Sequence, residues 1–144
     1  MDSLKIKTVQ YQDSMVVINQ IRTKVFQGEQ GVSAELEFDG LDANATHFLA
    51  YINGTAVGTA RIRELDWDTV KIERLAVLPD YRKQGIGKQL MKSALSAIAQ
   101  RGKFLVIVHA QAYIASLYQQ LGFAIVGEPF NEAGIPHVKM SKQL

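Results

Sequence analysis

The clearest pattern of hydrophobic and polar positions lies between residues 70 and 101. Residues 70–78 carry several β-branched side chains and predict a strand, which Pro79 ends. After a loop, apolar residues recur at helical spacing from Ile86 to Ile98, with lysine, glutamine and serine between them. This pattern predicts an amphipathic helix, and Gly102 suits its C-terminal cap.

The N-terminal part predicts a strand and two helices. A strand is expected from Leu4 to about Val9. Asp13 is expected to cap the first helix, and Ser33 a short second one. The segment from residue 22 to 42 contains several glycines and predicts an irregular wall rather than a continuous helix.

The remaining segments predict a sheet of mixed direction. Asn53-Gly54 favours a tight hairpin between residues 48–52 and 56–62, because both turn positions need positive φ. The C-terminal part predicts in order a strand buried on both faces, a helix ended by Gly122 and two more strands, at residues 104–108, 113–121, 123–127 and 136–140. An antiparallel meander followed by alternating strands and helices indicates a mixed α/β fold. The helix at 85–101 should form a parallel crossover.

Composition excludes several classes of protein. At 144 residues we expect one domain, spanning 1–144. The chain has no cysteine, so it has no disulfide or thiol nucleophile. No apolar run approaches the ~20 residues of a membrane span, and Lys5 and Lys7 interrupt any signal-peptide core. We therefore expect a cytoplasmic protein with no membrane partner.

The net charge of +2 is too small to indicate a nucleic-acid partner. The distribution of charge is more informative. An acidic stretch contains Glu29, Glu35, Glu37, Asp39 and Asp42, and a basic group contains Arg82, Lys83, Lys88 and Lys92. One interpretation is a basic mouth for a phosphate-rich ligand beside an acidic wall for a cationic one. The other is ordinary solvated surface charge.

The loop before the central helix reads Arg82-Lys83-Gln84-Gly85-Ile86-Gly87. Two glycines where a helix begins let several backbone N–H groups converge, and helix N-termini attract phosphate. A P-loop would need Ser or Thr at Gln89, and the dinucleotide fingerprint would need glycine at Leu90. A phosphate site of another kind and a simple helix-starting turn both remain open.

The pattern R-x-x-G-x-G in this loop resembles the pyrophosphate loop of the GNAT superfamily of N-acetyltransferases. Residues 111–123 resemble a second GNAT signature, in which a tyrosine, here Tyr118, is followed by Gly122-Phe123. The two occur in the expected order and separation, and the likeness covers essentially the whole chain. Shorter matches resemble the ElaA-like branch, namely Val25-Phe26, Glu29-Gln30, Glu37-Phe38-Asp39, His47-Phe48-Leu49-Ala50, Ala110-Gln111 and Gly134-Ile135-Pro136-His137.

The resemblance implies a GNAT fold, with a mostly antiparallel sheet of about six to seven strands, about four flanking helices and a parallel strand pair at the cofactor cleft. It implies acetyl-CoA as cosubstrate and an unidentified amine acceptor, and it is compatible with a homodimer. The cofactor-binding residues that it implies are Leu75, Ala76 and Val77 for the pantetheine arm, Arg82, Lys83, Gln84, Gly85, Ile86, Gly87 and Lys88 for the pyrophosphate, and Gln111, which stands where the family often has Asn.

A thioester is already activated, so an amine can attack it directly without a covalent enzyme intermediate. Such a reaction needs a base for the amine, a donor for the oxyanion and an acid for the leaving thiolate. The resemblance assigns the acid to Tyr118, since a phenol can protonate a thiolate. It makes the Val77 N–H a candidate oxyanion donor.

The base is left open between several residues. Glu73 shares strand parity with Leu75 and Val77, so we expect its side chain at the cleft, either as the base or as an ion-pair partner. His109 ends the strand after the central helix and has either a catalytic or a structural role. His47 and His137 either line the acceptor pocket or are structural. No set of His, Asp and Glu has the spacing of a metal site, so no metal is expected.

The sequence therefore predicts an acetyl-CoA-dependent N-acetyltransferase acting on a primary amine. One alternative is a non-catalytic acyl-CoA-binding or regulatory module, against which the intact Tyr118 argues. Another is an acyl-homoserine-lactone synthase, which Arg22, Val25-Phe26 and Glu37-Phe38-Asp39 resemble but the glycine loop does not. The sequence does not identify the acceptor.

Overall fold

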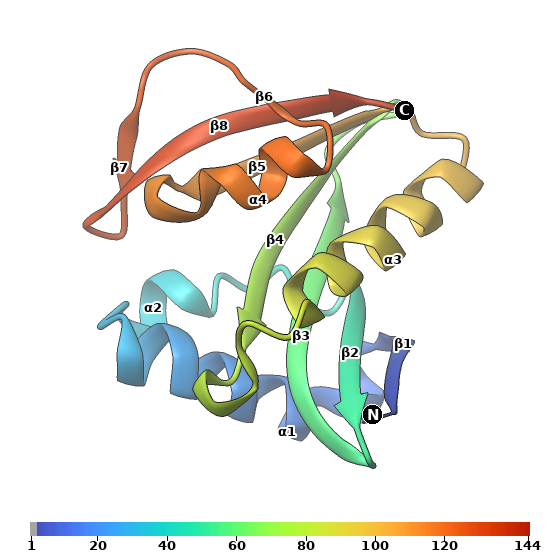
Figure 1. The fold of residues 1–144 in the computed structure, drawn as a ribbon, viewed down its shortest axis with the longest axis vertical. Coiled ribbons are helices and arrows are strands. Elements are labelled where there is room, and N and C mark those ends of the chain that lie inside the picture. Colours follow the sequence, from blue (N-terminus) through green and yellow to red (C-terminus); the bar gives the residue numbers. More distant parts are fainter. Residues whose placement is uncertain (1–2) are drawn as a thin grey trace.

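The computed structural model describes residues 3–144 and contains an open sheet with helices on both faces (Figure 1). The sheet has eight strands in the order β1-β2-β3-β4-β5-β8-β6, and β7 pairs with β8. Among these described strands only β4 and β5 pair in parallel. The mixed α/β fold is confirmed. The strand predicted at 123–127 is present as β6, of two residues, and the strand number exceeds six to seven because β7, of three residues, is too short to show in the hydrophobic pattern.

The strands are β1 Leu4–Gln10, β2 Thr46–Ile52, β3 Thr55–Glu64, β4 Thr69–Val77, β5 Leu105–Gln111, β6 Ala124–Ile125, β7 Phe130–Glu132 and β8 Ile135–Gln143. The α-helices are α1 Tyr11–Arg22, α2 Ala34–Glu37, α3 Ile86–Gln100 and α4 Ala115–Gln120. A π-helix, Thr23–Glu29, continues α1, and two short 3-10 helices are Pro79–Tyr81 and Ala112–Ile114. None of the helices within residues 3–144 has the length and apolar character to cross a membrane.

The local signals for the meander are confirmed. Asn53 and Gly54 adopt φ of 49° and 84°, as the predicted tight hairpin between β2 and β3 requires. Helix α3 connects β4 to β5, which pair in parallel over Thr69–Ile72 and Leu105–Val108. The predicted crossover element is therefore present.

Two hydrophobic cores lie on opposite faces of the sheet. The larger contains the buried side of α3, with Leu90 and Ile98 fully buried against β2 to β5. The smaller lies under α1, where Ile18 and Ile21 pack on Leu49. Gly58 in β3 lets α3 approach closely, because a Cβ there would lie 3.0 Å from a Leu90 methyl group. This close packing fixes the start of α3 relative to β4.

The first helix does not begin as predicted, whereas the second does. Gln10 occupies the N-cap position of α1 and Asp13 lies inside the first turn, because the helix starts directly after β1. There the negative charge of the Asp13 carboxylate interacts favourably with the helix dipole, but the side chain does not cap the helix. Ser33 caps α2 as expected, since its Oγ accepts a hydrogen bond from the Leu36 N–H (3.4 Å).

Strand β5 is not buried on both faces, contrary to the prediction from its apolar run. Val106, Val108 and Ala110 are buried in the larger core, but the alternate residues Leu105 and Ile107 are half-buried. Helix α1 packs against β1 to β4. Within residues 3–144 the alternate residues of β5 on this face are therefore only half-buried.

Candidate functional site

A cavity of about 770 Å³ opens where β4 and β5 separate. Their parallel pairing ends at Ile72 and Val108. Arg74 then adopts a φ of 58°, and the register with β3 shifts opposite it, which marks a β-bulge. A bulge bends its strand, so the rest of β4 turns away from β5. From Leu75 to Val77 one edge of β4 therefore has no partner strand and lines the cavity.

The structure brings nearly all the predicted cofactor-binding residues to this cavity. It is lined by Leu75, Ala76, Val77, Arg82, Lys83, Gly85, Ile86, Gly87, Lys88 and Gln111. Gln84 is the exception, because it is exposed and lies outside the cavity lining. The two signatures therefore meet in space although they are far apart in sequence.

The start of α3 has the form of an anion site. Gly85 is the N-cap residue with a left-handed φ of 79°, and a Cβ built on it would meet nothing within 4 Å. Within residues 3–144 no acceptor is found for the backbone N–H groups of residues 85–88. Unpaired amides at a helix N-terminus suit phosphate oxygens. The residues present therefore fit a diphosphate.

Arg82 lies at the mouth of the cavity and is already paired. Its Nη1 donates to Glu29 Oε2 (2.6 Å), and its Nε donates to the Val77 carbonyl (3.0 Å). The hydrogen bond from Arg82 lowers the pKa of Glu29. Both side chains are more than a third exposed. This pairing could not be inferred from the sequence, because the two residues lie 53 positions apart.

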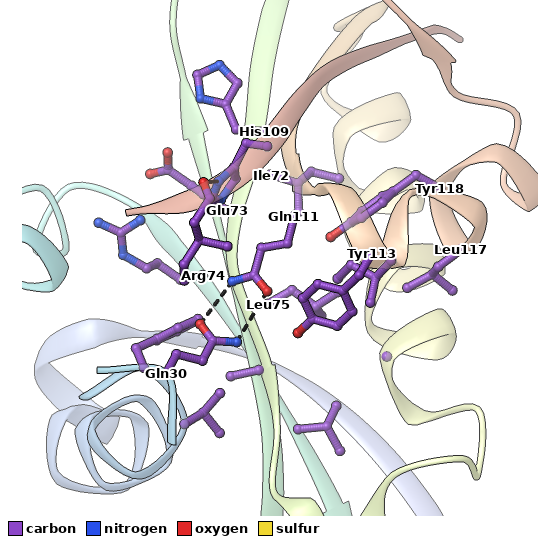
Figure 2. A pocket seen from close by; sticks show the side chains of 18 of the residues that line it. Gln30, Ile72, Glu73, Arg74, Leu75, His109, Gln111, Tyr113, Leu117 and Tyr118 are labelled. Atoms are coloured by element: carbon purple, nitrogen blue, oxygen red, sulfur yellow. Dashed lines mark hydrogen bonds between the residues drawn. The ribbon is translucent and has the colours of Figure 1, made fainter. Parts of the chain in front are cut away.

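Tyr118 lies on α4 with its ring edge-on to Phe123 and only 6% exposed. Figure 2 shows its hydroxyl directed towards the space beside Gln111. No hydrogen bond to this hydroxyl is found among residues 3–144. Burial raises the pKa of Tyr118, so the phenol carries its proton at neutral pH and can donate it.

Glu73 lines the cavity, but not by the predicted parity. Leu75 packs on the larger core, whereas Glu73 lies opposite Arg61 of β3 on the other face of the sheet. The bulge at Arg74 inserts one residue between them and reverses the alternation. The alternation of side chains along the sequence could not reveal this bulge, because the inserted residue is an arginine, which does not by itself indicate a bulge.

The carboxylate of Glu73 is held by three cations. It accepts hydrogen bonds from Arg61 and from Arg63 (3.0 Å), and Lys71 Nζ lies 3.2 Å away. Burial would raise the pKa of Glu73, but the hydrogen bond from Arg63 and the charges of Arg61 and Lys71 outweigh it and lower the pKa to about 2. The predicted ion-pair role is present in the structure, whereas a role as base stays a prediction.

The acids of the acidic stretch at positions 37, 39 and 42 belong to an ion network with arginines, whereas Glu29 and Glu35 are exposed. Arg22 donates to Glu37 (2.6 Å) and Asp42 (2.5 Å), and all three residues are buried. Arg61 donates to Asp42 (3.0 Å) and to Asp39 (2.9 Å). Glu37 and Asp42 are therefore buried and neutralised by arginines, so solvated surface charge does not describe them. Asp39 is exposed, and Glu37 and Asp39 line the cavity, so an acidic wall for an amine stays a prediction.

We expect Glu73→Gln to lower the free energy of unfolding by about 3 kcal/mol at pH 7, since the folded-state pKa lies below the usual 4.5. A depressed carboxylate pKa stabilises the fold above pH 4.5, and this contribution is lost as the pH falls from 4.5 towards 2. Urea denaturation at pH 7 and pH 3 measures both effects. The difference between wild type and variant should shrink at pH 3; a constant difference would contradict the ion-pair role. Glu35→Gln, at an exposed acid on α2, is the control.

The histidines divide into two groups. His47 is buried away from the cavity, where its Nε2–H donates to the Asp42 carbonyl (3.0 Å) and burial lowers its pKa. It therefore cannot line an acceptor pocket. His109 and His137 both line the cavity, and both lie near Glu132 of β7.

Gln111 has a partner that the sequence did not indicate. Its Nε2 donates to Gln30 Oε1 (2.9 Å), and Gln30 Nε2 donates back to Gln111 Oε1 (3.3 Å). Figure 2 shows the two amides meeting across the cavity, with Tyr113, Leu117 and Tyr118 on one side and His109, Glu73 and Arg74 on the other. The pair links the end of the π-helix to the end of β5.

Known proteins resemble this chain both in sequence and in fold. Residues 9–144 match the family model described as an acetyltransferase (GNAT) domain. Escherichia coli ElaA is 33% identical over 87% of this chain and 84% of its own, and its crystal structure superposes with a TM-score of 0.87, at 29% identity over 97% of this chain and 99% of that one.

Two further proteins are similar. The Bacillus subtilis uncharacterized N-acetyltransferase YjcF is 37% identical over 85% of this chain and 87% of its own. The crystal structure of an acyl-CoA N-acyltransferase from Pseudomonas aeruginosa has a TM-score of 0.85 at 31% identity, covering 97% of this chain and 99% of that one. The cleft between two separating parallel strands, the glycine loop and the sequence matches agree, and the chain belongs to the GNAT acetyltransferase family.

Proposed function

We propose that this protein is an acetyl-CoA-dependent N-acetyltransferase that transfers an acetyl group to a primary amine by direct attack on the thioester. The observation that carries the proposal is the row of unpaired amides at residues 85–88, which opens onto the cavity that also contains Tyr118. An acetyltransferase from Elizabethkingia anophelis with the same fold (TM-score 0.72, 20% identity) has acetyl-CoA bound. That structure supports acetyl-CoA as the cosubstrate.

The free edge of β4 suits the amide-bearing pantetheine arm. The Leu78 N–H donates to Val57 of β3 (2.8 Å), so the N–H of Val77, one residue earlier, points to the opposite side, towards the cavity. The Val77 carbonyl lies on that side too, since it accepts from Arg82. These groups can pair with a ligand as a neighbouring strand would. The Val77 N–H is accordingly our candidate to stabilise the oxyanion.

The roles in the proposed reaction follow from these positions. Acetyl-CoA supplies an activated acyl group. The amides of residues 85–88 hold its diphosphate together with Arg82 and Lys83, and Gly87 gives the ligand close access to the backbone. Tyr118, buried and protonated, gives its proton to the leaving sulfur. The remaining requirement is a base for the amine.

A screen for thiol release from acetyl-CoA tests the proposal. Monoamines, polyamines, amino acids and lysine-containing peptides are the acceptors, and mass spectrometry identifies the acetylated nitrogen. Transfer to at least one primary amine is expected. Calorimetric binding of acetyl-CoA without transfer to any acceptor would favour a non-catalytic acyl-CoA-binding module instead.

Glu29→Gln should tighten acetyl-CoA binding about two- to fivefold. The exposed pair with Arg82 contributes about 0.2–1 kcal/mol, and Arg82 no longer has to leave a carboxylate to meet a diphosphate. Calorimetry at low ionic strength measures the change in Kd. Glu35→Gln removes the same charge from a residue that does not contact Arg82, and it should leave Kd nearly unchanged. Equal tightening in both variants would mean that only the net charge matters.

A further inference from the structure

The reaction roles assigned above leave out a cluster of side chains at the end of β5, formed by His109, Phe130, Glu132 and His137. His109 Nδ1 lies 3.1 Å from Glu132 Oε1, and His137 Nε2 lies 3.6 Å from Glu132 Oε2. Phe130 packs edge-on against the His109 ring, with 5.1 Å between centroids, and stacks on His137 at 5.9 Å. His109, Glu132 and His137 line the cavity on the side of β5 opposite the larger core.

The contact with Glu132 fixes the tautomer of a neutral His109. A carboxylate only accepts, so Nδ1 carries the hydrogen and Nε2 carries the lone pair. Among residues 3–144 no hydrogen bond to Nε2 is found. His109 is 27% exposed, and the edge-on ring of Phe130 restricts its rotation. An oriented imidazole with a free lone pair in a cavity is suited to accept a proton.

Glu73 is a poorer proton acceptor at the same place. The register of β4 and β5 puts it beside His109, one residue beyond the last pair, Ile72 and Val108. Its oxygens are already engaged by Arg61, Arg63 and Lys71. A proton transferred to Glu73 would have to displace those contacts, whereas Nε2 of His109 has no such contact to lose.

We propose that His109 is the base that takes a proton from the attacking amine through Nε2, and that Glu132 is the positioning residue that holds its ring. This proposal rests on the proposed function. The amine nitrogen bonds to the acetyl carbon while the carbon–sulfur bond breaks. The amine proton goes to His109 and the Tyr118 proton goes to sulfur. Solvent then returns a proton from His109 to Tyr118, so the protein is unchanged.

Several charged or titratable groups lie around His109. They are Glu132 from β7, Lys139, its direct neighbour on β8, His137 from the same strand, and Glu73 and Lys71 from β4. Glu73 is neutralised by its cations. Glu132 is therefore the unneutralised carboxylate in contact with the ring, and its removal leaves Nδ1–H without the partner that orients the imidazole.

His109→Gln tests the base, with the best amine of the thiol-release screen as acceptor. We expect kcat/KM for the amine to fall at least about 100-fold and Kd for acetyl-CoA to stay within about twofold. His137→Gln, at the neighbouring histidine, should lower kcat/KM much less. Glu132→Gln should lower kcat about tenfold with little change in KM.

A measurement without any amine tests the geometry separately. Nitrogen-15 shifts of the imidazoles in the intact protein should show His109 as the Nδ1–H tautomer, and this preference should weaken in Glu132→Gln. An Nε2–H tautomer in the wild type overturns the proposal, as does a His109→Gln variant whose kcat/KM for the amine stays within about threefold of the wild type. If the wild type transfers acetyl to no amine, the proposed function fails, and the proposed base fails with it. The tautomer measurement, by contrast, tests the base alone.

Discussion

Gly85→Val is expected to raise the Kd of acetyl-CoA at least about 100-fold in calorimetry, and to abolish measurable binding at ordinary concentrations. Gly85 has a φ of 79°, which costs a residue with a Cβ about 1–2 kcal/mol. The added side chain also enters the open space above the helix start, where nothing lies within 4 Å. That is the space in which a diphosphate would meet the amides of residues 85–88.

Gly102→Val separates these two effects. Gly102 lies at the other end of α3 with a φ of 74°, and a Cβ there also meets nothing within 4 Å. Its valine variant should therefore pay a similar conformational cost, which chemical denaturation measures, while binding acetyl-CoA within about twofold of the wild type. An unchanged affinity in Gly85→Val would refute the assignment of the loop.

Tyr118→Phe is expected to lower kcat about 10²–10⁴-fold, the usual range for the loss of a general acid. The affinity for acetyl-CoA should stay within about twofold, because the change removes one oxygen and leaves the ring on Phe123. Since no partner of the hydroxyl is found among residues 3–144, the free energy of unfolding should change by less than about 1 kcal/mol. Single-turnover thiol release and calorimetry measure the two quantities.

Tyr113→Phe is the matched control for this variant. Tyr113 also lines the cavity but is 73% exposed. Loss of the Tyr113 hydroxyl should lower kcat much less than loss of the Tyr118 hydroxyl does. Equal turnover of Tyr118→Phe and wild type would remove the tyrosine from the mechanism.

Signals that act within a few residues predicted their structures well. Asn53-Gly54 specified its hairpin, and Ser33 its helix cap, because each depends on local backbone geometry. The period of apolar residues from Ile86 to Ile98 specified α3. The glycine loop lies between β4 and α3 as expected, and the predicted cofactor-binding residues lie at one cavity, with Gln84 as the exception.

Features that depend on distant partners could not be predicted in this way. The bulge at Arg74 reversed the alternation on which the orientation of Glu73 was based. The ion pairs of the acids at 37, 39 and 42 gave no sequence signal, because their arginine partners lie elsewhere in the chain. The pairing of Gln30 with Gln111, 81 positions away, gives no sequence signal of its own. Such pairings arise only when the sheet has formed.

The half-buried face of β5 has a consequence for the order of binding. Tyr118 approaches the cavity from α4, on the face of the larger core, whereas His109 and Glu132 approach it from the opposite face. In the proposed reaction the donor and the acceptor would thus occupy separate sides of one layer and meet at the gap between its strands. Neither would have to depart before the other arrives, and the architecture suits a ternary complex rather than a ping-pong exchange.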